Sequence, residues 1–156
     1  MTINLEKLRF VKNIDDSDWA YKDWQKGSQQ HLHWAKGSET NANKAQLGDL
    51  ILLVQKPDHI QEARVTHLVE VTSNAAETSG GDWGIVRQVS VIWVADFTHE
   101  ASIARDRDLF GWKRQRAQGT NLIELENIKE GKLLHLWHSP EIFQQHVAGI
   151  LRLIEE

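Results

Sequence analysis

The chain of 156 residues has no cysteine, only two prolines, and a single methionine and tyrosine. Without cysteine, neither disulfide bonds nor a cysteine-ligated zinc site can stabilise the fold, and secretion gains no support. The longest apolar run, residues 50–54, is far shorter than the roughly 20 residues that span a bilayer. Residues 1–10 carry charges where a signal peptide is apolar. We therefore expect a cytoplasmic protein with no membrane role.

Positive charge is also in short supply. The 18 Lys and Arg residues are outnumbered by 22 Asp and Glu residues, which gives a formal net charge of −4. Indiscriminate wrapping of duplex nucleic acid needs a large basic surface, so the net charge argues against this binding mode, whereas a local basic patch stays open. The proportions of hydrophobic residues, 40%, and charged residues, 26%, are typical of a globular protein. The length fits one core, so residues 1–156 are predicted to form a single domain.

Tryptophan, in contrast, is abundant, with seven residues in the chain. A tryptophan side chain combines a large apolar surface with one N–H donor, and proteins use both when they retain it. This excess is the first indication of a ligand that stacks on aromatic rings.

Alternating apolar residues predict several strands. The clearest pair is residues 50–55 and 64–71, which are separated by a turn and form an antiparallel hairpin. Residues 85–97 predict a long strand that carries Trp93 inward. Further short strands are predicted at residues 9–11, 122–125 and 133–137.

Helices are predicted mainly near the two ends of the chain. An acidic cluster at residues 15–18 suits a helix start, which predicts a short helix over residues 19–24. Residues 31–43 are polar and irregular and predict a loop that leads into a helical turn at residues 43–47. Ser139, Pro140 and Glu141 predict the start of an amphipathic C-terminal helix.

Hairpin strands combined with helices near the ends indicate the α+β class. The predicted architecture is a curved mixed β-sheet or small open β-barrel of about five to six strands, with flanking helices and the C-terminal amphipathic helix.

The order of short motifs over residues 9–97 resembles the PUA-like superfamily, especially its EVE and YTH branches. In those families an early strand and a short helix precede a Trp-containing loop, an Asn follows, and a hairpin leads to a second Trp-bearing loop. The corresponding stretches here are Phe10-Val11, His33-Trp34-Ala35, Asn41 to Asn43, Gly48-Asp49-Leu50-Ile51-Leu52, Thr66-His67-Leu68-Val69-Glu70-Val71, and Asp82-Trp83 to Val91-Ile92-Trp93.

The resemblance implies a module that reads a nucleotide base. Its YTH-like form implies that Trp34 and Trp83 are the walls of an aromatic cage, with Asn41 or Asn43 near the base edge. Its EVE-like form emphasises Gly48-Asp49, which opens the strand that carries Gln55. It also implies nucleic acid as the partner, with DNA and RNA both open, and a nuclease supplied by a neighbouring chain.

General chemistry supports such a pocket independently. An extruded base stacks on aromatic faces and is identified by hydrogen bonds from amide side chains. The predicted base-binding residues are Trp34, Trp83, Asn41, Asn43, Gln55, Trp19 and Trp24. The alternative for each Trp is a place in the core, as expected for Trp93 and Trp137, and the alternative for the Asn residues is a turn or cap.

A basic segment around Trp112 is the predicted phosphate-binding element. Its cations are Arg105, Arg107, Lys113, Arg114 and Arg116. They could hold the phosphates of a strand while the Trp112 ring stacks on a base. The alternative is an ordinary solvated loop, because exposed charge runs need no further explanation.

Catalytic machinery is not evident. There is no Cys nucleophile, no G-x-S-x-G elbow and no P-loop, and the eight His residues lack the spacing of a zinc site. We therefore predict no catalytic residue, metal or cofactor. Two alternatives stay open: an ASCH-like amidohydrolase that acts on a modified nucleoside and uses Lys44, Thr66 and Glu70, and a protein-interaction domain that docks partners on exposed Trp residues.

Overall fold

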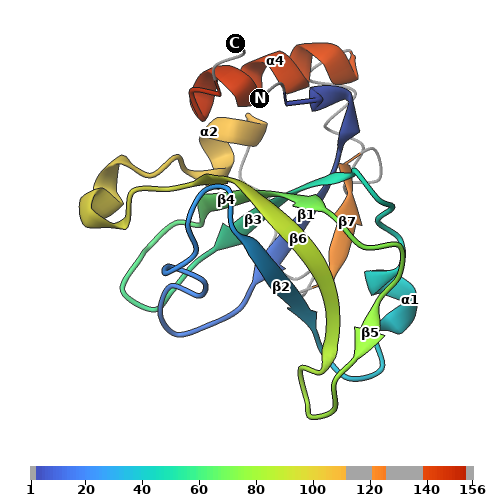
Figure 1. Cartoon of the computed structure of the whole chain (residues 1–156). Helices are drawn as coiled ribbons and strands as arrows, with labels where there is room; N and C mark the ends of the chain where they lie inside the picture. The colour runs from blue at the N-terminus through green and yellow to red at the C-terminus, as the bar shows by residue number, and fades with distance from the viewer. Residues whose placement is uncertain (1–2, 112–120, 126–138, 154–156) are drawn as a thin grey trace.

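The computed structural model describes residues 3–111, 121–125 and 139–153 (Figure 1). The predicted strand at residues 133–137 lies outside these ranges. None of the described helices has the length and apolar character needed to cross a bilayer. In chain order, the elements that position the site are η1 (Leu5–Lys7), β1 (Leu8–Ile14), β2 (Gln29–Trp34), α1 (Glu39–Ala42), β3 (Leu50–Gln55), β4 (Arg64–Val71), β5 (Glu77–Thr78), β6 (Ile85–Val94), η2 (Phe97–Ser102), α2 (Asp106–Phe110), β7 (Leu122–Glu124) and α4 (Pro140–Ile150).

The strands form one mixed, strongly curled sheet. Its order is β2-β6-β4-β3-β1-β7, and the short strand β5 also pairs with β6. Strands β1 and β3 pair in parallel, whereas the other described pairs are antiparallel. Register shifts in the β3–β4 and β4–β6 pairs mark bulges, which bend strands and increase their twist. The predicted α+β class with a curved mixed sheet is thereby confirmed.

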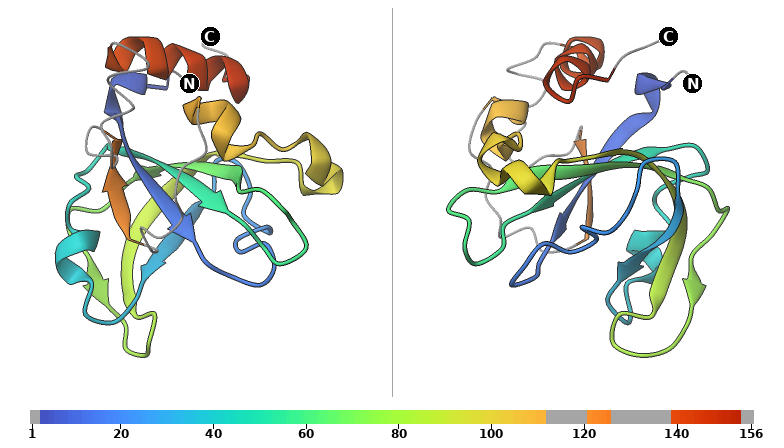
Figure 2. Two further views of the ribbon diagram at one scale, coloured as in Figure 1. Left: turned by 180° about the vertical axis from the view of Figure 1, so that it is seen from behind. Right: turned by 60° about the vertical axis from the view of Figure 1, so that its left-hand side comes forward.

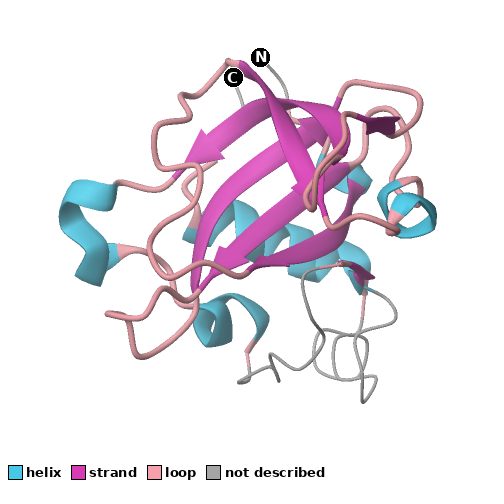
Figure 3. Ribbon diagram, turned by 90° about the horizontal axis from the view of Figure 1, so that it is seen from below, coloured by secondary structure: helices cyan, strands magenta, loops and turns pink. Residues whose placement is uncertain are grey.

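The two faces of the sheet carry separate hydrophobic clusters. Every residue of β3 is buried, because alternate side chains enter opposite clusters. On one face, Leu50, Leu52 and Val54 pack with residues of α2 and α4. On the inner face of the curl, Ile51 and Leu53 pack with β1, β2 and β6. Figures 2 and 3 show α2 and α4 at one side of the sheet, away from the β5–β6 turn.

Two sequence predictions are confirmed closely. The hairpin strands have the predicted bounds, Leu50–Gln55 and Arg64–Val71. The C-terminal helix begins as expected, because the Ser139 side chain accepts a hydrogen bond from the Ile142 N–H and a proline opens the first turn. Its buried side chain Phe143 stacks on Phe110 of α2.

Three local predictions are wrong. The segment 19–24 is a series of turns, with Tyr21 in the left-handed region at φ 61°, because tertiary hydrogen bonds hold it in place of helical ones. Residues 31–34 of the predicted loop 31–43 belong to strand β2, whose buried residues are only Leu32 and Trp34. The helical turn lies at Glu39–Ala42 and ends before the predicted range begins.

A buried guanidinium connects the inner face to the loops around it. Arg87 of β6 is only 1% exposed. Its Nη1 donates to the carbonyls of Ala42 and Ala45, both at 2.7 Å, and its other nitrogens donate to the hydroxyl and carbonyl of Ser73. Burial lowers the pKa of Arg87, an effect that the charge of Asp49 opposes. The side chain thereby fixes the end of α1 and the loop that follows β4.

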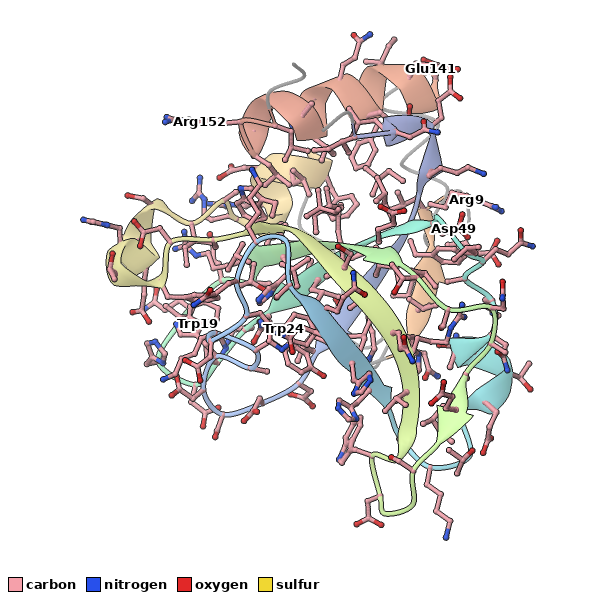
Figure 4. The ribbon with its side chains drawn as sticks, in the orientation of Figure 1. Arg9, Trp19, Trp24, Asp49, Glu141 and Arg152 are labelled. Carbon is pink, nitrogen blue, oxygen red and sulfur yellow. The ribbon has the colours of Figure 1, made fainter. Side chains whose placement is uncertain are left out.

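We predict that Arg87→Ala lowers the free energy of unfolding by about 3 kcal/mol or more, because two buried carbonyls and a partly buried one lose a charged donor. Arg9→Ala is the matched control. Arg9 is half-exposed and lies 3.9 Å from Asp49, so its loss should cost less than about 1 kcal/mol (Figure 4). Urea unfolding of both variants measures the difference, and equal losses would contradict the role given to Arg87.

Candidate functional site

A large pocket opens at the inner face of the sheet, between the end of β1, the β1–β2 loop and the β5–β6 turn. Its volume is about 800 Å³, within the usual range for small-molecule sites. We call it the Trp83 pocket. Its aromatic and ionisable lining side chains are Lys12, Asp15, Asp16, Tyr21, His33 and Trp83, and Ile14, Ala20, Ser79 and Gly80 complete it.

Trp83 is presented by a tight glycine-rich turn between β5 and β6. The Ser79 N–H donates to the Gly84 carbonyl at 2.7 Å, while Gly80 and Gly81 adopt a φ of 82° that favours glycine. A Cβ on Gly84 would lie only 2.2 Å from the Gly80 oxygen, so a side chain cannot fit there. The turn leaves Trp83 50% exposed and on the lining of the pocket.

The opposite wall is the β1–β2 loop, which two buried side chains hold in place. Gln55, at the end of β3, accepts from the Ala20 N–H at 2.7 Å and donates to the Ala20 carbonyl at 2.9 Å. His67 of β4 donates from Nε2 to the Tyr21 carbonyl at 3.0 Å. Thr66 links them, because its hydroxyl accepts from Gln55 and lies 2.8 Å from His67 Nδ1. The pocket wall is therefore attached to the central strands.

The protonation of this network follows from its burial. Burial lowers the pKa of His67 to about 4, against a smaller opposing effect of its bond to the Tyr21 backbone. At neutral pH the ring is uncharged, so Nε2 carries the proton and Nδ1 accepts from the Thr66 hydroxyl. Burial raises the pKa of Tyr21; a backbone hydrogen bond at His33 opposes this, and the charge of Asp16 adds to it. Tyr21 is therefore a neutral phenol in the pocket.

Lys12 forms the floor of the pocket and is the least expected residue there. It lies on the same face of β1 as Phe10 and Ile14, which belong to the inner hydrophobic cluster, and it is only 1% exposed. Its ammonium lies 5.0 Å from the centroid of the Trp34 ring, a cation–π distance. Burial nevertheless lowers the pKa of Lys12 to about 7, so its amine can change protonation near neutral pH.

Only one of the two tryptophans predicted to form an aromatic cage lines the pocket. Trp83 lines the pocket as expected, but Trp34 is fully buried and presents no free face. Its Nε1 donates to Asn41 Oδ1 at 2.9 Å, and Lys12 covers its ring. Asn41 also accepts from the Leu122 N–H and donates to the Leu122 carbonyl. The prediction that Trp34 and Asn41 contact a base is therefore corrected: they connect β2 to β7 in the interior.

The remaining predicted base-binding residues also lie outside the pocket lining. Asn43 accepts from the Ala76 N–H, and Gln55 holds the β1–β2 loop with both ends of its amide. Trp19 is 7% exposed and donates from Nε1 to Glu100, while Trp24 stacks on Tyr21 with ring centroids 4.1 Å apart (Figure 4). Each of these four side chains has a partner within the fold.

The predicted phosphate-binding segment does not face the pocket where the structure describes it. Arg105 contacts Asp108 at 2.7 Å and Glu62 at 3.3 Å, and Arg107 contacts Glu62 at 3.3 Å. Both arginines belong to the start of α2, which packs on the outer face of the sheet. Lys113, Arg114 and Arg116, together with Trp112, lie outside the described residues.

The three residues predicted for the alternative hydrolase function, Lys44, Thr66 and Glu70, do not lie together in the structure. Lys44 is exposed, Thr66 is buried in the network with Gln55 and His67, and Glu70 lines a separate small cavity. Lys12 is instead the ionisable group with a shifted pKa in the pocket. In the described ranges, no group of three or more His, Asp or Glu side chains is arranged to hold a metal ion.

Sequence reasoning missed Lys12, Tyr21, His33, Asp15 and Asp16 as pocket residues. A signal existed for one of them: a lysine stands in phase with the buried residues Phe10 and Ile14 of a strand. The other four give no such signal, because a wrongly expected helix and loop placed them elsewhere.

We predict that Lys12→Met raises the free energy of unfolding at pH 7, because burial disfavours the charged lysine whereas an apolar side chain has no such desolvation cost. In the wild type, the pKa of Lys12 is about 7 when folded and higher when unfolded, so this lysine makes stability rise from pH 7 toward pH 10. Urea unfolding from pH 7 to 9.5 should show a flatter profile for the variant. Exposed Lys36→Met is the control, and an unchanged pH profile in Lys12→Met would refute the shift.

Comparisons with known proteins do not identify a function for this chain. The chain matches no known family profile and no curated protein. It is similar to a solved structure described as a hypothetical protein from Leishmania major, with 10% sequence identity and a TM-score of 0.45. The match covers 88% of this chain and 98% of that one. A likeness at this level carries no argument about function.

Proposed function

We propose that this domain is a binding module that accepts one unpaired or flipped nucleobase, including a modified one, in the Trp83 pocket. The observation that carries the proposal is the half-exposed Trp83 ring on the wall of a pocket of about 800 Å³. A large apolar ring that stays exposed at a concave site is a stacking surface without a partner. Tyr21 adds a second aromatic side chain, and Lys12, Asp15 and Asp16 add hydrogen-bonding groups for the base edges.

The partner in this proposal is nucleic acid, either DNA or RNA. The order of motifs that resembles the PUA-like superfamily supports this assignment, and a nuclease on a neighbouring chain is the further partner that the resemblance adds. Cytoplasmic localisation belongs to the same proposal, because a chain without cysteine has no disulfides to gain in an oxidising compartment.

One observation favours a second function, a hydrolase that acts on a modified nucleoside in the same pocket. Lys12 has a pKa of about 7, a value suited to proton transfer at neutral pH. Incubation with modified nucleosides and chromatographic analysis of the products distinguishes the two functions: conversion that disappears in Lys12→Met supports the hydrolase, and binding without conversion supports the reader.

We predict that Trp83→Ala weakens binding to single-stranded oligonucleotides at least about tenfold, because stacking on an aromatic ring contributes about 1–3 kcal/mol per base. Fluorescence anisotropy with labelled oligonucleotides bearing plain or modified bases, at fixed low salt, measures this change. Trp83→Phe should retain most of the affinity, and Leu47→Ala, which removes another exposed apolar side chain, should retain all of it. If the wild type binds none of the oligonucleotides, the reader function is wrong.

A further inference from the structure

The Trp83 pocket combines an aromatic side chain with negative charge. Trp83 is half-exposed on the wall formed by the β5–β6 turn. Asp15 and Asp16 belong to the β1–β2 loop, which forms the opposite wall, and both are exposed and line the pocket. Exposed aspartates carry negative charge at neutral pH. A ligand that enters the pocket therefore meets an aromatic ring on one side and two carboxylates on the other.

Hydrogen bonds within the β1–β2 loop leave this negative charge in place. The Oδ1 atom of Asp16 accepts from the Ser17 hydroxyl and from the Asp18 N–H, both at 3.5 Å. These donors are neutral, so they do not cancel the charge of the carboxylate. The charge also acts across the pocket lining, because it contributes to the raised pKa of Tyr21. The carboxylates can therefore favour a ligand through its charge, whatever hydrogen bonds they make.

Positive charge on the pocket lining is smaller. Among the described lining residues, Lys12 is the only lysine or arginine. Its side chain is 1% exposed, and its ammonium lies 5.0 Å from the centroid of the buried Trp34 ring. Because burial lowers the pKa of Lys12 to about 7, part of the population is uncharged at neutral pH. The two exposed aspartates therefore outweigh this lysine, and the pocket is negatively charged.

We propose that the Trp83 pocket selects bases that carry a positive charge, with the base stacked on Trp83 and its charge balanced by Asp15 and Asp16. Methylation of the N1 atom of adenine or of the N3 atom of cytosine gives such a cation. A cationic base is attracted to the face of a tryptophan and to carboxylates, whereas a neutral base gains stacking alone. This gain does not depend on which edge of the base faces the aspartates. The inference rests on the proposed base-binding function and names the class of modified base for it.

Matched methylated bases provide the experiment, because the members of each pair have the same ring and one methyl group but differ in charge. The first pair is cationic N1-methyladenine and neutral N6-methyladenine, and the second is cationic N3-methylcytosine and neutral C5-methylcytosine. Each base is placed at the same position of a single-stranded oligonucleotide. We expect the wild type to bind the cationic member of both pairs at least about tenfold more tightly at neutral pH. Fluorescence anisotropy at fixed low salt measures each affinity.

Added salt tests the role of charge without any variant. Contacts to phosphates are common to both members of a pair, so salt weakens those contacts equally for both. The attraction between a cationic base and exposed carboxylates is screened in addition. We therefore expect the preference for the cationic member to fall at least about twofold between low and high salt. A preference that does not change with salt would contradict the role of the aspartates.

Variants identify the residues that select the cation. Asp15→Asn and Asp16→Asn should each reduce the preference at least about threefold, with little change in the affinity for the neutral members. Glu141→Gln is the control that removes the same charge from an exposed position on α4, which packs on the outer face of the sheet (Figure 4). It should leave the preference unchanged. Circular dichroism confirms that each variant is folded.

The outcomes distinguish this inference from the proposed function. If the wild type binds both members of a pair equally, prefers the neutral members, or prefers the cation in one pair alone, selection by charge is wrong while the reader function stands. A preference that survives unchanged in both Asp15→Asn and Asp16→Asn also overturns it. If none of the oligonucleotides binds to the wild type, the reader function fails, and this inference fails with it.

Discussion

Strand β3 is the constraint on which the rest of the structure depends. It pairs in parallel with β1 and antiparallel with β4, and all of its residues are buried between the two hydrophobic clusters. Its last residue, Gln55, also holds the β1–β2 loop in place, because its amide accepts from the Ala20 N–H and donates to the Ala20 carbonyl. The position of the pocket wall is thus a direct consequence of where β3 ends.

The pocket contains a buried lysine, Lys12, on a strand face that is otherwise apolar. An apolar side chain at position 12 would pack with Phe10 and Ile14 at no cost in desolvation, whereas the lysine amine is held there with its pKa lowered to about 7. Residues that do not suit their local structural environment, and that lower the stability of the fold, are typically found at functional sites. The place of Lys12 on the lining of the Trp83 pocket is consistent with that general pattern.

The curl of the sheet separates the molecule into a closed side and an open side. Helices α2 and α4 cover the outer face through residues such as Phe110 and Phe143. The inner face is closed only in part, by the side chains around Trp34, and its margin forms the pocket. Arg105 and Arg107 lie on the closed side, where they pair with Glu62 or Asp108, and neither lines the Trp83 pocket.

The sequence alone determined the class of fold, the β3–β4 hairpin and the capped C-terminal helix, because each follows from local periodicity and local hydrogen bonds. It also named Trp83, which lines the pocket, as one of several candidate residues, with a core position left open. Tertiary structure decided the rest of the site. Trp34, Asn41 and Gln55 have the residue types of a base-binding site, but partners distant in sequence take up their polar atoms. The same long-range packing placed Lys12 beside Tyr21 and Asp16, since only the pairing of strands decides which side chains meet.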